Sequence, residues 1–132
     1  MRSLRELVGV ELGPSAWFEV TQERIDAFGA CERAAAGPFG TTIAHGFLTL
    51  SLCVPMLYEL LPPVDRMVVN YGVNRVRFPA RVPSGSRIRG RFRIVDVEGA
   101  AGGERAAIEA TVECDAGAKP VCVAELVVLT LP

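Results

Sequence analysis

Few side chains in this sequence can perform acid–base or nucleophilic chemistry near neutral pH. His45 is the single histidine, and the four cysteines are Cys31, Cys53, Cys114 and Cys122. Histidine is the residue whose charge changes between about pH 5 and 8, and it is the usual base that activates a cysteine nucleophile. No second histidine and no Cys-x-x-Cys spacing occurs, so the sequence predicts thiols without a metal and implies no cofactor.

The arginines are unevenly distributed along the chain. Eight of them fall between Arg66 and Arg93, an interval without an acidic residue. Two interpretations remain open. The arginines are either solvated strand faces that pair with carboxylates from elsewhere, or part of a site for a phosphate-bearing ligand.

Length and composition exclude several classes of protein. The 132 residues are 50% hydrophobic and carry a net charge of −1, which favours one domain over residues 1–132 and argues against a nucleic-acid-binding protein. The longest apolar region, 43–61, is interrupted by His45, Thr49, Ser51 and Glu59, so no membrane span is predicted. Residues 1–9 lack a signal-peptide core, and we therefore expect a cytoplasmic protein with reduced thiols.

The N-terminal third predicts a short strand followed by a short helix. Trp17–Val20 has the strand composition, and Thr21 is a good helix N-cap. The helix is expected to start at about Gln22, with Glu23 in the first turn, where a negative charge is favourable.

A second helix is predicted over Ala44–Leu60, which is apolar almost all round. Such a helix is expected to be buried on every side. Pro55 is tolerated only with a kink, and the pair Pro62 and Pro63 ends the helix.

The remainder of the chain alternates apolar and polar residues, the period of β-strands. Four long strands are expected, over Met67–Phe78, Arg87–Val97, Arg105–Cys114 and Pro120–Leu131. One buried helix and hairpin-linked strands predict an α+β fold with a mostly antiparallel, strongly curved sheet around a long central helix.

Three segments carry a resemblance to a known family. They are 37–52 (GPFGTTIAHGFLTLSL), 70–80 (NYGVNRVRFPA) and 82–86 (VPSGS). In this order and spacing they resemble the MaoC-like (R)-specific enoyl-thioester hydratases and dehydratases. The resemblance implies a hotdog fold and a homodimer formed by sheets joining edge to edge. It also implies addition or removal of water at the double bond of an enoyl group carried on CoA or on an acyl-carrier protein.

The sequence departs from the family where the chemistry is expected. In relatives, an Asp and a His on a loop activate the water, and that loop lies between the first helix and the Gly-Pro turn. Here residues 25–37 (IDAFGACERAAAG) run on directly, so that the hydration-loop Asp and His are absent. The sequence leaves open whether this loss is natural or engineered.

The resemblance and the remaining titratable groups give four candidate catalytic residues. Gly46 matches the family's helix-start glycine, and its N–H is the expected oxyanion donor, or else the glycine only permits close packing. His45 matches the adjacent family histidine, and it is either a structural residue beside the helix or a catalytic one. Asp26 and Glu32 are the carboxylates near the missing loop, and each is either a solvated charge or a base.

Seven residues are candidates for binding the substrate. Two precede the helix and the others lie in the family-matched strand: Thr42, Ile43, Asn70, Tyr71, Arg75, Arg77 and Phe78. The arginines are expected to contact phosphates of CoA or of a carrier arm, or else to form strand and dimer ion pairs.

Different classes of function fit these observations. The first is an enzyme on acyl thioesters, either a hydratase weakened by the lost Asp and His or a hotdog thioesterase. The second is a non-catalytic subunit that binds an acyl thioester or forms a heterodimer with an intact paralogue. Activity on crotonyl-type thioesters, measured with and without that partner, discriminates between them.

Overall fold

The computed structural model describes residues 3–29, 42–100 and 102–132. It confirms the α+β fold, and none of its described helices is long and apolar enough to cross a membrane. The elements in chain order are the 3-10 helix η1 (Leu4–Leu7), β1 (Glu11–Leu12), β2 (Phe18–Glu19), α1 (Gln22–Phe28), α2 (Gly46–Leu60), β3 (Val68–Arg77), β4 (Arg87–Ala100), β5 (Gly103–Cys114) and β6 (Cys122–Thr130).

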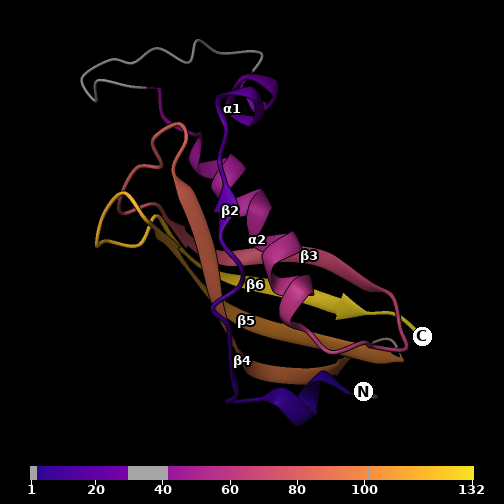
Figure 1. Cartoon of the computed structure of the whole chain (residues 1–132). Helices are drawn as coiled ribbons and strands as arrows, with labels where there is room; N and C mark the ends of the chain where they lie inside the picture. The colour runs from indigo at the N-terminus through magenta and orange to yellow at the C-terminus, as the bar shows by residue number, and fades with distance from the viewer. Residues whose placement is uncertain (1–2, 30–41, 101) are drawn as a thin grey trace.

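The strands form a six-stranded antiparallel sheet in the order β1-β4-β5-β6-β3, and β2 pairs with a second segment of β4. All four long strands are confirmed (Figure 1). The expected separation of two of them at 98–104 is wrong, because β4 continues to Ala100 and β5 already starts at Gly103. The pairing from Ile88↔Cys114 to Ala100↔Gly103, with one register shift between Ile94 and Asp96, makes this hairpin the longest ladder of the sheet.

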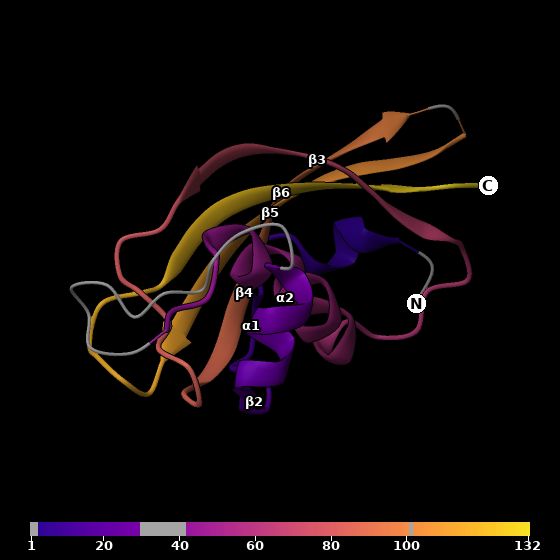
Figure 2. The same cartoon turned by 90° about the horizontal axis from the view of Figure 1, so that it is seen from above.

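Alternation along the strands decides which face of the sheet enters the core. In β5, Ala106, Ile108, Ala110 and Val112 are at most 1% exposed, whereas the residues between them are half-buried or exposed. Side chains of successive strand residues point to opposite faces, so this row packs on one side of the sheet. That side curves around α2 (Figure 2).

Helix α2 starts two residues later than the sequence predicts. Ala44 is extended because its N–H donates to Val82 O at 2.9 Å, while Ser84 N–H donates to Thr42 O at 2.9 Å. This pairing holds 42–44 outside the helix and makes His45 the N-cap residue. As predicted, the helix ends before Pro62 and Pro63.

The sheet covers only one side of α2. Leu48 and Leu52 are 6% and 8% exposed and pack in the core, as expected. On the other side Phe47 is 67% exposed and Tyr58 is 40% exposed. The expectation of a helix buried on every side is therefore wrong for the single chain, since an apolar sequence reports hydrophobicity but not which face has a neighbour.

The segment before α1 contributes more to the sheet than the sequence indicated. Trp17–Val20 forms only the short strand β2, while β1 and η1 were not predicted. Between β1 and β2, Ser15 N–H donates to Gly90 O at 2.9 Å and Ser15 Oγ accepts from Gly90 N–H at 3.0 Å. Gly13, with φ of 116°, brings the chain so close that a Cβ would lie 2.7 Å from Gly90 O. The segment thus closes one edge of β4.

Helix α1 begins as predicted. Thr21 is its N-cap, and the Thr21 Oγ1 accepts a hydrogen bond from Arg24 N–H at 3.1 Å. Ile25 is fully buried and fixes the helix against the rest of the domain. This helix places Phe28 and Gly29 beside the start of α2, where Gly29 packs against the His45 ring.

Candidate functional site

The start of α2 presents two backbone donors without an intrahelical acceptor. Leu48 N–H and Thr49 N–H donate to His45 O at 3.0 and 3.3 Å. The amides of Gly46 and Phe47 donate to no acceptor among the residues that the structure describes. Free amides at a helix N-terminus attract negative charge, and they suit an oxygen that gains charge during a reaction.

His45 lies between the two helices. Its ring centroid is 5.7 Å from that of Phe28, at an interplanar angle of 47°. A Cβ on Gly29 would approach His45 Nε2 to 2.8 Å, so the ring packs directly on the end of α1. The side chain makes no hydrogen bond to cap α2. The position of His45 therefore combines a packing role with closeness to the Gly46 amide.

Asp26 belongs to a different group of side chains. It is exposed and accepts a hydrogen bond from Gln22 Nε2 at 2.8 Å. Gln22 Oε1 in turn accepts from the Thr42 hydroxyl, which links α1 to the segment before α2. Gln22 was not singled out in the sequence, and only its spacing of four residues from Asp26 on the helix suggests this bond.

Of the other predicted residues near the start of α2, Ile43 is described by the structure and Glu32 is not. Ile43 is half-buried and forms an isolated antiparallel bridge with Pro83. Glu32 and the neighbouring Cys31 lie outside the described residues, so their proposed roles remain predictions.

The predicted substrate residues on β3 do not all share one face. Asn70 is exposed and lies opposite the buried Val128, on the side of the sheet that carries α2. Arg75 lies opposite Glu125 and Arg77 opposite Val123, on the other side. The strand pattern alone could not place them, because two register shifts interrupt β3.

Tyr71 lies at the first of those register shifts and is 65% exposed. It lines a cavity of about 440 Å³ together with Asn74 and Glu125, and Asn74 Nδ2 donates to Glu125 Oε1 at 2.7 Å. Tyr71 thus borders a polar recess that β3 shares with β4, β5 and β6. Another cavity, of about 270 Å³, lies at the C-terminal end of α2 beside Tyr58.

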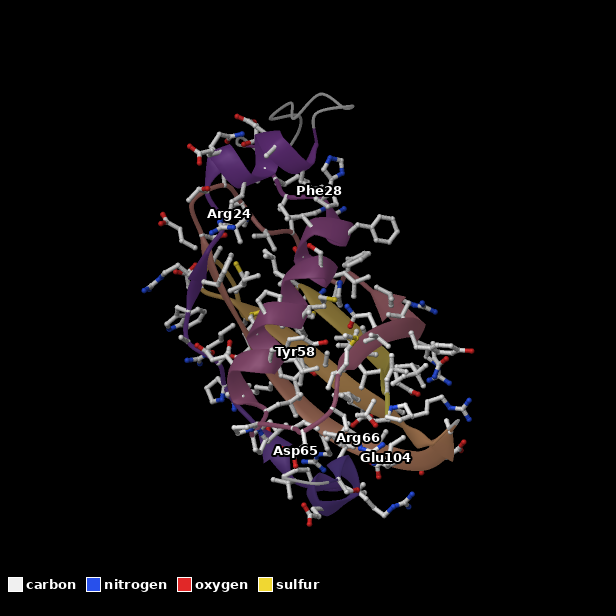
Figure 3. The ribbon with its side chains drawn as sticks, turned by 90° about the vertical axis from the view of Figure 1, so that its right-hand side faces the viewer. Arg24, Phe28, Tyr58, Asp65, Arg66 and Glu104 are labelled. Carbon is white, nitrogen blue, oxygen red and sulfur yellow. The ribbon has the colours of Figure 1, made fainter. Side chains whose placement is uncertain are left out.

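The labelled side chains in Figure 3 separate the two ends of the molecule. Arg24 and Phe28 lie at the end that carries α1, whereas Asp65, Arg66 and Glu104 lie at the opposite end. Arg66 donates to Gly102 O at 2.8 Å there. Phe28 contacts the ring of His45, which is the N-cap residue of α2.

The arginines of β4 pair with carboxylates. Arg89 Nη2 lies 3.2 Å from Glu113 Oε2, and Arg91 also donates to Glu113. Arg87 Nε lies 3.0 Å from Asp115 Oδ2. The bond from Arg91, supported by Arg89, holds the pKa of Glu113 below its usual range. For these arginines the interpretation as paired strand charges is confirmed.

Arg75 and Arg77 differ from the β4 arginines. Neither forms an ion pair with a described residue, and Arg77 Nη1 donates only to Val76 O, at 2.8 Å. Both side chains are exposed on the outer side of the edge strand. They therefore remain available to a ligand or a partner.

Cys53 and Cys122 are fully buried, and the Cys53 thiol donates to Thr49 O at 3.8 Å. The neighbouring Cys122 thiol and the burial raise the pKa of the Cys53 thiol far above its ordinary value, whereas the interaction with Cys53 lowers the pKa of Cys122 although burial opposes this. Cys114 is also buried and free. These three thiols belong to the core.

The family of this chain follows from its similarity to known proteins. The MaoC-like domain matches residues 30–117, two thirds of the chain. The chain belongs to the MaoC-like domain family. A relative, 3-hydroxyacyl-thioester dehydratase Z of Mycobacterium tuberculosis, is 45% identical over 139 aligned residues, which cover 95% of this MaoC-like chain and 91% of the relative.

Solved structures confirm the hotdog fold of this MaoC-like domain. The unliganded R-hydratase PhaJ1 of Pseudomonas aeruginosa superposes with a TM-score of 0.72 at 21% identity, over 93% of this chain and 81% of the other. The C-terminally truncated HadBC (3R-hydroxyacyl-ACP dehydratase) complex of Mycobacterium tuberculosis gives 0.76 at 16% identity, over 93% and 96%. At these identities the likeness concerns the fold alone.

The mycobacterial relative has residues that this MaoC-like chain lacks. The alignment with this relative extends over 139 positions, whereas this MaoC-like chain has 132 residues in all. The relative therefore has residues at positions where this chain has none.

Proposed function

We propose that this MaoC-like domain binds an acyl thioester, carried on CoA or on an acyl-carrier protein, with the thioester oxygen at the Gly46 and Phe47 amides. The observation that supports the proposal is that the two N–H groups at the start of α2 donate to no acceptor among the described residues. Hydration of an enoyl thioester places enolate charge on that oxygen, and fixed donors stabilise such charge. The name of the relative, a 3-hydroxyacyl-thioester dehydratase, supports the same substrate class.

The hydration activity of the chain alone is proposed to be weak. This proposal is supported by residues 25–37, in which no counterpart of the family's Asp and His is recognised. Asp26 is exposed and bound to Gln22, while His45 packs on Gly29 and Phe28. Proton transfer by a positioned base contributes about 10²–10⁴-fold, so its loss lowers turnover without preventing binding.

A second chain is proposed to complete the domain. Among the described residues β3 pairs only with β6, so its other edge presents free backbone groups. Large apolar side chains are also exposed on α2 and on β3. They include Phe47 and Tyr58 on α2 and Val73 on β3. An identical copy, or a paralogue that carries the Asp and His, covers this surface. We place the complex in the cytoplasm.

Two assays on the purified protein test the proposal. Calorimetric titration with a saturated acyl-CoA measures binding, and loss of the enoyl absorbance of crotonyl-CoA measures hydration. We expect binding with little hydration by the chain alone, and higher hydration after co-expression with an intact paralogue. A monomer at micromolar concentration in sedimentation would contradict the proposed dimer.

Other outcomes contradict the proposal in distinct ways. If the protein bound no acyl-CoA, the proposed binding of an acyl thioester would be wrong. Release of the free CoA thiol, detected with a thiol reagent, would favour a thioesterase. Ordinary hydratase turnover would show that a base is present, and Asp26→Ala, Glu32→Ala and His45→Ala would then be tested singly. If none of the three lowered turnover, the account of the site would be wrong.

A further inference from the structure

The ring of Phe78 lies directly on the backbone of Gly46. A Cβ built on Gly46 would lie 2.6, 2.7 and 2.8 Å from three carbons of this ring. Side chains do not approach a Cβ so closely, so the ring occupies the space that any other residue at position 46 would need. Phe78 is half-buried and follows directly after the end of β3.

Other contacts hold this ring and the first turn of α2 in place. The rings of Phe47 and Phe78 meet edge to face, with centroids 6.0 Å apart and an interplanar angle of 90°. The segment before the helix is paired through Ala44 N–H, which donates to Val82 O at 2.9 Å. The first turn of α2 is therefore held by the 82–84 segment and by the Phe78 ring.

We propose that Phe78 is a positioning residue, whose ring fixes the direction of the Gly46 and Phe47 amides toward the thioester oxygen. This inference rests on the proposed binding of an acyl thioester. Donors to a developing oxyanion act strongly only when they are held in place before the reaction. Gly46 has no side chain of its own to restrain the turn, and the flat ring supplies that restraint.

This role differs from the substrate contact that the sequence suggested for Phe78. A residue that only lines the acyl pocket would change affinity when it is shortened. A residue that orients the amides would change the polarisation of the bound carbonyl, with little effect on affinity, because the acyl chain and the CoA moiety keep their contacts.

The experiment measures that polarisation directly. A saturated acyl-CoA with a ¹³C-labelled thioester carbonyl is bound to the full chain, and its carbonyl stretch is recorded by infrared difference spectroscopy. A hydrogen bond to the carbonyl lowers this frequency. The variants are Phe78→Leu and Phe78→Tyr, with Phe18→Leu as the matched control, since Phe18 is also half-buried but packs under Arg24.

We expect a lowered frequency in the parent, and a shift reduced to less than half in Phe78→Leu while its affinity stays within about threefold. Phe78→Tyr and Phe18→Leu should keep the full shift. In a double-mutant cycle, Gly46→Ala alone should displace the ring and lose the shift. The extra loss on adding Phe78→Leu to Gly46→Ala should be small, because both changes remove the same contact.

Two results overturn the inference in different ways. A parent that binds without any frequency shift refutes the oxyanion site, and with it the role of Phe78. A parent with a shift that Phe78→Leu retains in full refutes the positioning role alone. If Phe78→Leu does not fold, Phe78→Met, which keeps apolar volume but not the flat ring, gives the same two readings.

Discussion

Replacing Ser15 by alanine is expected to leave a buried hydrogen-bond donor without a partner. Ser15 is 5% exposed, and its Oγ accepts from Gly90 N–H at 3.0 Å. The backbone bond from Ser15 N–H to Gly90 O, at 2.9 Å, survives the change. Gly90 N–H points toward the N-terminal segment, and no second acceptor for it occurs among the described residues.

The size of the effect follows from this loss. An unsatisfied buried donor costs about 1–3 kcal/mol. For a chain of this length that corresponds to a fall in Tm of about 3–12 °C. Urea unfolding at neutral pH, followed by circular dichroism, measures the change in the free energy of unfolding. Faster hydrogen exchange at Gly90 N–H should accompany it.

Two variants control this prediction. Ser51→Ala removes the hydroxyl of an exposed residue, which donates to Leu48 O at 2.7 Å within α2, and it should change stability by less than about 0.5 kcal/mol. Ser15→Thr keeps the accepting oxygen and should lose less than Ser15→Ala. Equal stabilities of the Ser15→Ala and Ser51→Ala proteins would refute the reasoning, since the buried donor would then find another partner at no cost.

Three further predictions concern charge and the missing loop. Arg77→Ala should weaken acyl-CoA binding more than Arg91→Ala, because Arg91 is held by Glu113 whereas Arg77 bonds only to backbone; equal affinities with a weaker dimer would favour ion pairing instead. The lowered pKa of Glu113 means that its charge stabilises the fold above the unfolded pKa of about 4.3 and that this contribution is lost as pH falls through the folded value. The stability difference between the parent and Glu113→Gln in urea unfolding should therefore shrink from pH 7 to pH 3, and a constant difference would contradict it. Inserting the family's Asp- and His-bearing loop between Cys31 and Glu32 should raise crotonyl-CoA hydration, and a graft that binds acyl-CoA but stays inactive would argue against loss of the dyad as the cause.

Much of the fold could be predicted because the signals were local. The alternation over 105–114 predicted strand β5, and Thr21 predicted the start of α1 within one residue. The motif around Gly46 and the strand ending at Phe78 indicated the family, which the match over 30–117 then confirmed. Such signals depend only on residues that are close together in the sequence, so they can be read without the tertiary structure.

The start of the central helix shows where local signals fail. Apolar periodicity favoured a start at Ala44, yet the hydrogen bond from Ala44 N–H to Val82 O excludes it from the helix. Likewise, the pattern could not show that the sheet leaves Phe47 exposed. Both outcomes depend on segments far away along the chain.

The candidate site divides in the same way. The sequence by its motifs identified Gly46 as part of the family pattern, and it led to the hypothesis that the family's Asp and His have no counterpart here. Only the tertiary structure decided that Phe78 packs on Gly46 and that Arg75 and Arg77 face away from α2. The register shifts in β3 and the pairing of 42–44 with 82–84 set these side-chain positions. Both arise from contacts between segments that the chain brings together only when it folds.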